Sequence, residues 1–327
     1  MVASTCMRIN RSLVVVLLAI VACTRSADPE LVEGFRVACA RLAAAAEAAN
    51  TSVVTGNDGW YFAAGEIASL GAAATDSTAA ASAISAHAAR LRENGIELVV
   101  APVPPKGIVY PDRLAPELDV PIPVRRLDAT LQDAYADLRA RDVRVVDLTE
   151  AFIRDRFHPE GPLYCRQDSH WSGVGCVVAA QIIAAAVRDA GVLEVPPDPL
   201  YGLAWFTTPI RGNLGQGLPE PPQREEIRAR GVIAPEDPLL APVARDGNAP
   251  IAIVGDTHTL VFHDGEPYHA TGAGVADQLA FEFRQPVALY ADDGGSSSTA
   301  TLELPALGEL TRTVIWIFAA TRLLGGA

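Results

Sequence analysis

The chain has 327 residues, of which 50% are hydrophobic and 20% are charged. This composition excludes a disordered or fibrous protein, and it suffices for one large α/β domain or two average domains. The 39 acidic residues outnumber the 26 lysines and arginines, which gives a net charge of −13 at pH 7. Such a balance argues against a nucleic-acid partner or an anionic membrane surface as partner, because both require clustered positive charge.

The N-terminus has the pattern of an export signal. Two arginines precede an apolar run, residues 13–21, which is too short to cross the hydrocarbon core of a membrane. We therefore expect residues 1–22 to be a signal peptide and the protein to be periplasmic. The run ends in Ile-Val-Ala-Cys, which is similar to the bacterial lipobox and predicts a lipid anchor on Cys23. The alternative is an ordinary signal peptide in which Cys23 is incidental.

The remaining chain alternates between helical and strand patterns. Helices are predicted at residues 28–50, 73–94, 124–142 and 171–190. Buried strands are predicted from continuous apolar runs at residues 96–101, 143–148, 251–254 and 314–318. Residues 193–250 are rich in proline and have little periodicity, which favours an irregular connection over the surface.

Continuous apolar strands separated by helix-length segments indicate a parallel sheet covered by helices on both faces. In such sheets, ligands bind at the carboxyl ends of the strands. The segments of interest are residues 104–107 after the first strand, residues 255–258 directly after the third strand, and residues 167–171 between the second and third strands. No later stretch is long and apolar enough to span a membrane, so membrane contact is expected only through the lipid anchor.

Asp168 and His170 form the first candidate pair. In an extended backbone, residues i and i+2 lie on the same side, so the carboxylate of Asp168 can bond one nitrogen of the imidazole. That bond fixes the tautomer and leaves the other nitrogen free to act as a base. The structural alternative is that Asp168 caps the following helix and His170 is a satisfied, partly buried side chain.

Thr257 is the candidate nucleophile. It follows the strand predicted at residues 251–254, after Gly255 and Asp256, and the glycine permits a tight turn that directs the hydroxyl into the crevice above the sheet. Backbone N–H groups of this turn are available to bind an oxyanion. Together with the Asp-x-His pair, Thr257 completes the minimal set for acyl transfer. The alternative is an Asp–Thr pair that only caps the next element.

Further candidates for oxyanion or substrate binding lie in or near these motifs, and they include Gly255 and Asp256 themselves. Asn213 stands in a glycine-rich turn and either donates to an oxyanion, lines the cleft or has only a turn role. Lys106 is the only lysine of the sequence, and it either binds an acidic group or is solvated. Trp171 directly follows the Asp-x-His pair.

The cysteines allow two interpretations. Cys165 and Cys176 flank the Asp-x-His motif, and a disulfide between them would close a short loop around it. Buried free thiols are the alternative. Metal binding is not predicted, because neither the cysteines nor the histidines at 258, 263 and 269 have the spacing of a zinc site. We expect no other cofactor.

A larger pattern emerges from the order of four motifs along the chain, at residues 56–62 (GNDGWYF), 102–111 (PVPPK followed by YP), 168–171 (DSHW) and 255–257 (GDT). This ordered set resembles the periplasmic alginate O-acetyltransferases of the AlgX/AlgJ type. The resemblance implies an α/β, SGNH-hydrolase-like parallel sheet flanked by helices, with a permuted motif order, over residues 53–327. Residues 23–52 would then form an N-terminal tether and helix.

The resemblance also implies roles for the site residues. Asp168 would orient His170, His170 would be the general base, and residue 257 would be the nucleophile. The family has a serine at this position, whereas this chain has Thr257. A threonine hydroxyl can act as a nucleophile, but its methyl group restricts χ1 and crowds the path of attack.

Three functions are compatible with this site. The first is an exported O-acetyltransferase for an exopolysaccharide such as alginate, with an acyl-enzyme on Thr257 and, as the resemblance implies, acyl groups supplied by a membrane-bound O-acyltransferase. The second is a carbohydrate acetylesterase that delivers the acyl group to water. The third is a non-catalytic lipoprotein for polysaccharide binding or assembly. The sequence does not separate the first two, because they differ in water exclusion and acceptor placement.

Overall fold

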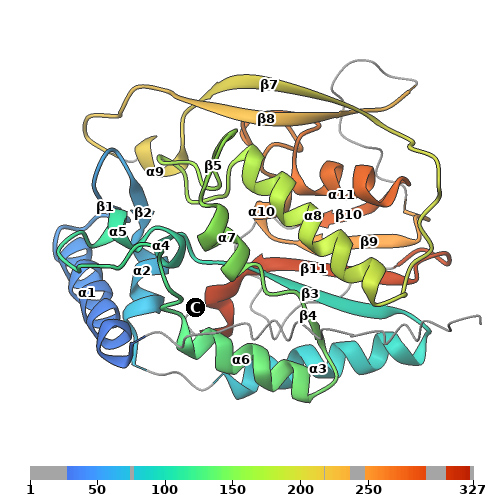
Figure 1. The fold of residues 1–327 in the computed structure, drawn as a ribbon, viewed down its shortest axis with the longest axis horizontal. Coiled ribbons are helices and arrows are strands. Elements are labelled where there is room, and N and C mark those ends of the chain that lie inside the picture. The colour runs from blue at the N-terminus through green and yellow to red at the C-terminus, as the bar shows by residue number, and fades with distance from the viewer. Residues whose placement is uncertain (1–27, 74–76, 217, 236–246, 292–306, 325–327) are drawn as a thin grey trace, which may run out of the picture.

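A computed structural model describes residues 28–73, 77–216, 218–235, 247–291 and 307–324. Its centre is a parallel sheet with the strand order β10–β9–β11–β3–β4 (Figure 1). The strands are β3 (Glu97–Val103), β4 (Arg144–Val145), β9 (Ile251–Gly255), β10 (Ala288–Ala291) and β11 (Thr313–Ala319). The predicted parallel sheet is confirmed, although β4 is shorter than expected and β10 was not predicted.

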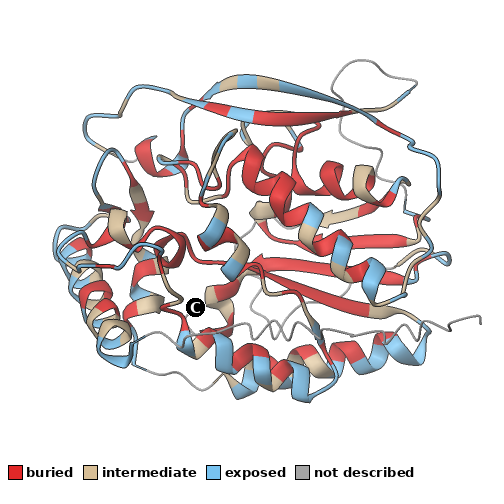
Figure 2. Ribbon diagram, viewed as in Figure 1, coloured by how far each residue is buried: buried red, intermediate tan, exposed pale blue. Residues whose placement is uncertain are grey.

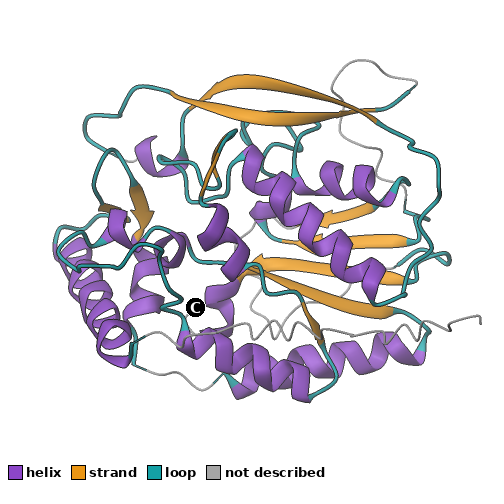
Figure 3. Cartoon of the chain, viewed as in Figure 1, coloured by secondary structure: helices purple, strands orange, loops and turns teal. Residues whose placement is uncertain are grey.

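Helices cover both faces of this sheet (Figures 1 and 3). One face packs against α8 (Gly173–Asp189) and α11 (Val275–Phe283), and the other against α3 (Thr78–Glu93) and α6 (Ala129–Ala140). Alternate residues of each strand point to opposite faces, as in any β-strand. In β11, for example, Ile315 and Ile317 belong to the first core and Trp316 to the second. Figure 2 shows the central strands as almost entirely buried, which explains their continuous apolar sequences.

The N-terminal part forms a separate layer at the end of the sheet. Helix α1 (Pro29–Ala48) packs on α2 (Ala64–Gly71), beside the antiparallel pair β1 (Val53–Thr55) and β2 (Tyr61–Ala63). The predicted helix at 28–50 is thus confirmed. The remaining elements are short: α4 (Lys106–Val109), α5 (Pro111–Leu114), α7 (Thr149–Asp155), β5 (Phe157–His158), β6 (Gly161–Pro162), α9 (Asn213–Gln216), α10 (Thr257–Leu260) and the 3₁₀-helix η1 (Ala320–Leu324).

The prediction that residues 193–250 form an irregular connection is wrong. This region contains a long antiparallel hairpin of β7 (Gly202–Ile210) and β8 (Glu225–Ile233), which runs over the outside of α8 (Figure 1). Strand β7 is mostly exposed, so it lacks an apolar face that sequence periodicity could detect. Its Pro209 is tolerated because this strand lies at the edge of a two-stranded sheet.

The carboxyl ends of three central strands meet at one edge of the sheet. Ile317 of β11 is in register with Gly255 of β9, and Ala319 is in register with Val103 of β3. The segments that follow these strands therefore begin side by side. As predicted, the motif that contains Lys106 and the motif that contains Thr257 start at this edge.

The predicted signal peptide, residues 1–22, and the lipidation candidate Cys23 lie outside the described residues. Among the described residues, no helix combines the length and the apolar character that a membrane span requires.

The predicted disulfide between Cys165 and Cys176 is not formed. Both are buried free thiols, as is Cys39. The two sulfur atoms have separate environments, because Cys165 Sγ lies 3.7 Å from the carbonyl oxygen of Trp171, to which it donates, whereas Cys176 lies on α8. Burial raises the pKa of all three thiols, and it raises that of Cys39 to about 12.

We expect these thiols to be inert in the folded protein, because a buried thiol carries almost no thiolate at neutral pH. In a chain with Cys6→Ser and Cys23→Ser, purified without reductant, an aromatic disulfide reagent should detect no thiol before unfolding and three after unfolding in guanidinium. Detection of a single thiol in the unfolded chain would instead establish a disulfide.

Candidate active site

Asp168, His170 and Thr257 form one chain of hydrogen bonds. Asp168 Oδ1 lies 2.7 Å from His170 Nδ1, and His170 Nε2 lies 2.7 Å from Thr257 Oγ1. Because Nδ1–H is donated to the carboxylate, the neutral ring offers its Nε2 lone pair to the threonine hydroxyl. The predicted convergence of these three residues is confirmed. Their geometry is that of a nucleophile, a base and an orienting acid.

Asp168 is 1% exposed and has further partners. Its Oδ1 also accepts from the backbone N–H of His170 at 3.0 Å, and its Oδ2 accepts from the backbone N–H of Asn213 at 2.8 Å and from His269 Nε2 at 3.0 Å. Burial raises the pKa of Asp168, but the hydrogen bonds and charges of His170 and His269 outweigh burial and hold it well below its usual range. The carboxylate therefore stays ionised beside the base.

The loop that carries Asp168 and His170 is held by the hairpin that was not predicted. Glu225, the first residue of β8, accepts hydrogen bonds from the backbone N–H groups of Arg166 and Gln167 at 2.9–3.1 Å. Asn213 bonds Ser169 twice, accepting from its backbone N–H and donating to its hydroxyl. The amide of Asn213 thus bonds this loop, and its donation to an oxyanion stays a prediction.

Both interpretations of Lys106 are wrong, because its side chain is neither solvated nor an anion-binding group at the surface. It is 1% exposed, and its Nζ donates to the carbonyl oxygens of Tyr61, Arg166 and Asp168 at 2.5, 3.0 and 2.9 Å. Burial lowers the pKa of Lys106 to about 8. The ammonium group ties β2 to the loop that carries the base.

The turn after β9 positions Thr257. Gly255 ends the strand at a point where a Cβ would overlap Thr259 and the carbonyl of Ile317, and Asp256 caps α10 by accepting from the backbone N–H of His258. That N–H is therefore not available to an oxyanion.

Trp171 is buried and donates from Nε1 to the carbonyl oxygen of His258 at 3.0 Å, which links the two motifs of the site.

Two features of the site were missed from the sequence. His269 bonds Asp168 from 101 residues away, and no local pattern signals this contact. Its φ of +77° is unusual for a residue other than glycine, a conformation that persists only where the surroundings impose it. Asp256 and His258 form a second Asp-x-His pair, which the spacing rule used for Asp168 would have found.

The histidines at 258, 263 and 269 do not come together as metal ligands. Each bonds a different aspartate: His263 Nδ1 lies 2.8 Å from Asp277 Oδ2 in the buried core, whereas His258 bonds Asp256 and His269 bonds Asp168. Within the described ranges, no group of three or more His, Cys, Asp or Glu side chains has the arrangement of a metal site.

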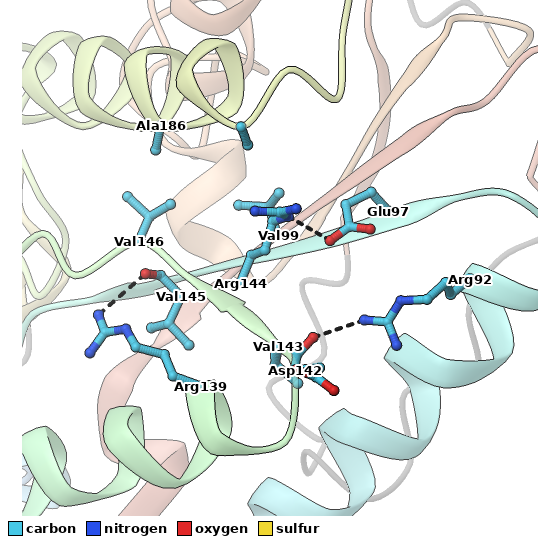
Figure 4. Close-up of a pocket in the computed structure, with 11 residues that line it drawn as sticks. Arg92, Glu97, Val99, Arg139, Asp142, Val143, Arg144, Val145, Val146 and Ala186 are labelled. Carbon is cyan, nitrogen blue, oxygen red and sulfur yellow. Dashed lines mark hydrogen bonds and ion pairs between the residues drawn. The ribbon is translucent and has the colours of Figure 1, made fainter.

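A cavity of about 700 Å³ lies elsewhere, beside β4 and the start of β3 (Figure 4). Residue Glu97 of its lining begins β3, whereas the triad lies past the opposite ends of the strands. The polar groups that line the cavity bond one another: Arg144 with Glu97, Arg92 with the carbonyl of Asp142, and Arg139 with the carbonyl of Val145. It is therefore separate from the candidate active site.

With this geometry established, comparison with known proteins identifies the family. Residues 53–320 match the family model described as an SGNH hydrolase-like domain, acetyltransferase AlgX. The chain belongs to this family, which confirms the predicted resemblance and fold class.

Particular relatives are AlgJ proteins of Pseudomonas. The chain is 30% identical over 208 residues to the probable alginate O-acetylase AlgJ of Pseudomonas putida, covering 62% of this chain and 51% of the relative. It is 29% identical over 180 residues to the protein of the same name from Pseudomonas aeruginosa, covering 54% and 44%. The chain thus spans about half the length of the curated relatives it matches.

Solved structures support the same fold. The O-acetyltransferase domain of Pseudomonas putida AlgJ superposes with a TM-score of 0.59 at 23% identity, covering 84% of this chain and 92% of that domain. Pseudomonas aeruginosa AlgX gives a TM-score of 0.58 at 18% identity, covering 83% and 65%. At these identities the likeness concerns the fold.

Replacement of Gly212 by any residue with a side chain should lower the stability of the protein. A Cβ at this position would overlap the backbone of Gln167, directly before Asp168. We expect Gly212→Ala to lower the free energy of unfolding by about 1–3 kcal/mol, measured by denaturant titration. Gly65→Ala on α2 is the matched control, because its Cβ meets nothing, and it should stabilise the protein by up to about 1 kcal/mol. Wild-type stability of Gly212→Ala would contradict the close approach.

Lys106→Met should destabilise the protein strongly, because it removes the buried ammonium group that three carbonyl oxygens share. The expected loss of unfolding free energy is about 3 kcal/mol, measured by denaturant titration. Arg41→Met removes an exposed cation instead and should change stability by less than about 0.5 kcal/mol. Equal effects of the two substitutions would show that Lys106 has no special structural role.

Proposed function

We propose that the protein is an exported polysaccharide O-acetyltransferase that works through an acyl-enzyme on Thr257. The observation that carries the proposal is the continuous Asp168–His170–Thr257 hydrogen-bond chain, with both links at 2.7 Å, inside an AlgX-family domain. The relatives named as probable alginate O-acetylases support the same type of reaction.

The geometry supports a two-step transfer. Thr257 Oγ1 attacks the carbonyl carbon of the acyl donor while His170 Nε2 accepts the hydroxyl proton, which then passes to the leaving group. In the second step, a sugar hydroxyl attacks the Thr257 ester, His170 takes its proton, and that proton returns to Thr257 as the ester bond breaks. Asp168, ionised and bonded to Nδ1, stabilises the imidazolium in both steps.

The proposal favours an enzyme over a binding protein that has lost its nucleophile. A threonine without a catalytic role has no need to donate to an oriented imidazole, yet Thr257 lies within hydrogen-bond distance of His170. The γ-methyl group of threonine does not prevent this contact.

We also propose the setting of the reaction. The export pattern of residues 1–22 and Cys23 supports a periplasmic protein anchored by lipid. The acyl donor would be supplied by a membrane-bound O-acyltransferase, and the acceptor would be a polysaccharide. The name of the AlgJ relatives makes alginate the first polymer to test.

The nucleophile and base are tested with a chromogenic acetyl ester. Thr257→Ala and His170→Ala should lower kcat by about 10²–10⁴. Thr257→Ser should raise kcat by about two- to tenfold, because serine lacks the methyl group that restricts χ1 and crowds the path of attack. Release of the chromophore and acetylation of an oligosaccharide acceptor are measured in parallel.

Thr207→Ala on the exposed strand β7 serves as the control and should have wild-type rates. Equal rates in wild type, Thr257→Ala and His170→Ala would leave only a binding role. Rapid chromophore release with acetate as the sole product, at saturating alginate oligosaccharide, would identify an esterase.

A further inference from the structure

The segment that carries Thr257 contains a second Asp-x-His pair, formed by Asp256 and His258. Asp256 Oδ1 accepts hydrogen bonds from the backbone N–H and from Nδ1 of His258, at 3.0 and 2.9 Å. Asp168 Oδ1 holds His170 in the same way, at 3.0 and 2.7 Å. The same local arrangement is therefore built twice within one site, on two segments that are distant in sequence.

The ring of His258 is fixed against the triad. Its centroid lies 4.8 Å from that of His170, with an interplanar angle of 70°, and 5.6 Å from that of Trp171, with an angle of 86°. Trp171 also bonds the carbonyl oxygen of His258. Contacts on several sides thus hold the ring next to the base that the transfer reaction uses.

Asp256 is the buried carboxylate of this pair. Burial raises the pKa of Asp256, but His258, the backbone N–H of Ala319 and the guanidinium of Arg322 outweigh burial and hold it well below its usual range. The ionised carboxylate accepts the Nδ1–H of His258, and this hydrogen bond sets the neutral tautomer of the ring.

The other nitrogen of His258, Nε2, is not engaged by Asp256, and the His258 side chain is 13% exposed. In the part of the chain that the structure describes, no residue bonds Nε2, and it is not one of the buried polar atoms without a partner. In the tautomer set by Asp256, Nε2 carries a lone pair. A lone pair accepts a hydrogen bond from a hydroxyl group but cannot donate one to an oxyanion. Nε2 of His258 is therefore suited to accept a hydrogen bond from the hydroxyl group of an alcohol.

We propose that His258 binds the acceptor sugar: its Nε2 accepts a hydrogen bond from one hydroxyl while an adjacent hydroxyl of the same sugar lies at His170. The inference rests on the proposed O-acetyltransferase function and names its acceptor class, a carbohydrate with neighbouring free hydroxyls. The hydroxyl at His170 attacks the Thr257 ester and loses its proton to His170, as in the second step above. The hydroxyl at His258 keeps its proton and orients the sugar.

Two substitutions of His258 test the proposal, and each keeps a hydrogen-bonding group near only one of the two ring nitrogens. His258→Asn places an amide near Nδ1, which keeps the bond to Asp256 but leaves no acceptor at Nε2. His258→Gln extends an amide oxygen toward Nε2, where it can still accept a hydroxyl proton. Acetyl transfer from a chromogenic acetyl ester is measured to methyl mannoside, which has adjacent hydroxyls, and to ethanol, which has one. His158→Gln, on the separate strand β5, is the control.

We expect His258→Asn to lower kcat/KM for methyl mannoside by about tenfold, the value of one hydrogen bond, mainly through the KM of the acceptor. Transfer to ethanol should fall by less than transfer to the mannoside does, because ethanol has no second hydroxyl for His258 to bind. His258→Gln should retain more transfer to the mannoside than His258→Asn does, and His158→Gln should match wild type.

A purely structural role through Asp256 gives the opposite order, in which His258→Asn is harmless and His258→Gln is damaging. That order, or an equal loss with mannoside and ethanol, would overturn the proposal. If wild type releases no more chromophore than His170→Ala, the O-acetyltransferase function itself fails. The acceptor site is then judged from titration of methyl mannoside onto Thr257→Ala, followed by tryptophan fluorescence: about tenfold weaker binding when His258→Asn is added supports it, and unchanged binding overturns it.

Discussion

The buried carboxylate of Asp168 is the group on which the site depends. It accepts hydrogen bonds from the backbone N–H groups of His170 and Asn213 and from the rings of His170 and His269. These donors belong to three segments that are far apart in sequence. Because a buried anion is stable only when it is fully bonded, the carboxylate and the three segments hold one another in place. The orientation of the base is therefore a property of the whole fold.

Lys106 stabilises the same loop through its backbone carbonyl groups. The carboxylate of Asp168 binds donors at the site, whereas its backbone carbonyl accepts from the Lys106 ammonium, together with the carbonyls of Tyr61 and Arg166. A lysine presents three donors at one atom, which matches three converging carbonyls. The N-terminal layer, through β2, is in this way part of the support of the active site.

Thr257 and His258 are neighbours in the candidate active site. The nucleophile carries an additional methyl group, and the residue after it is a histidine whose tautomer Asp256 sets. Transfer requires that a sugar hydroxyl is placed better than water is, so a second hydroxyl-binding nitrogen beside the base serves the step that distinguishes a transferase from an esterase.

The parallel sheet, four of its strands and the order of the site motifs could be predicted from the sequence, because continuous apolar runs and short motifs are local patterns. The position of Thr257 followed from the rule that strand ends share one edge of a parallel sheet. Its approach to Asp168 and His170, which do not follow a strand of the central sheet, was expected from the chemistry of acyl transfer and from the family resemblance. Only the tertiary structure showed the β7–β8 hairpin, the contact of His269 with Asp168, the buried position of Lys106 and the free thiols of Cys165 and Cys176. The reason is physical: an exposed strand such as β7 has no apolar periodicity to detect, and the partners of a buried polar group depend on which distant segments pack around it.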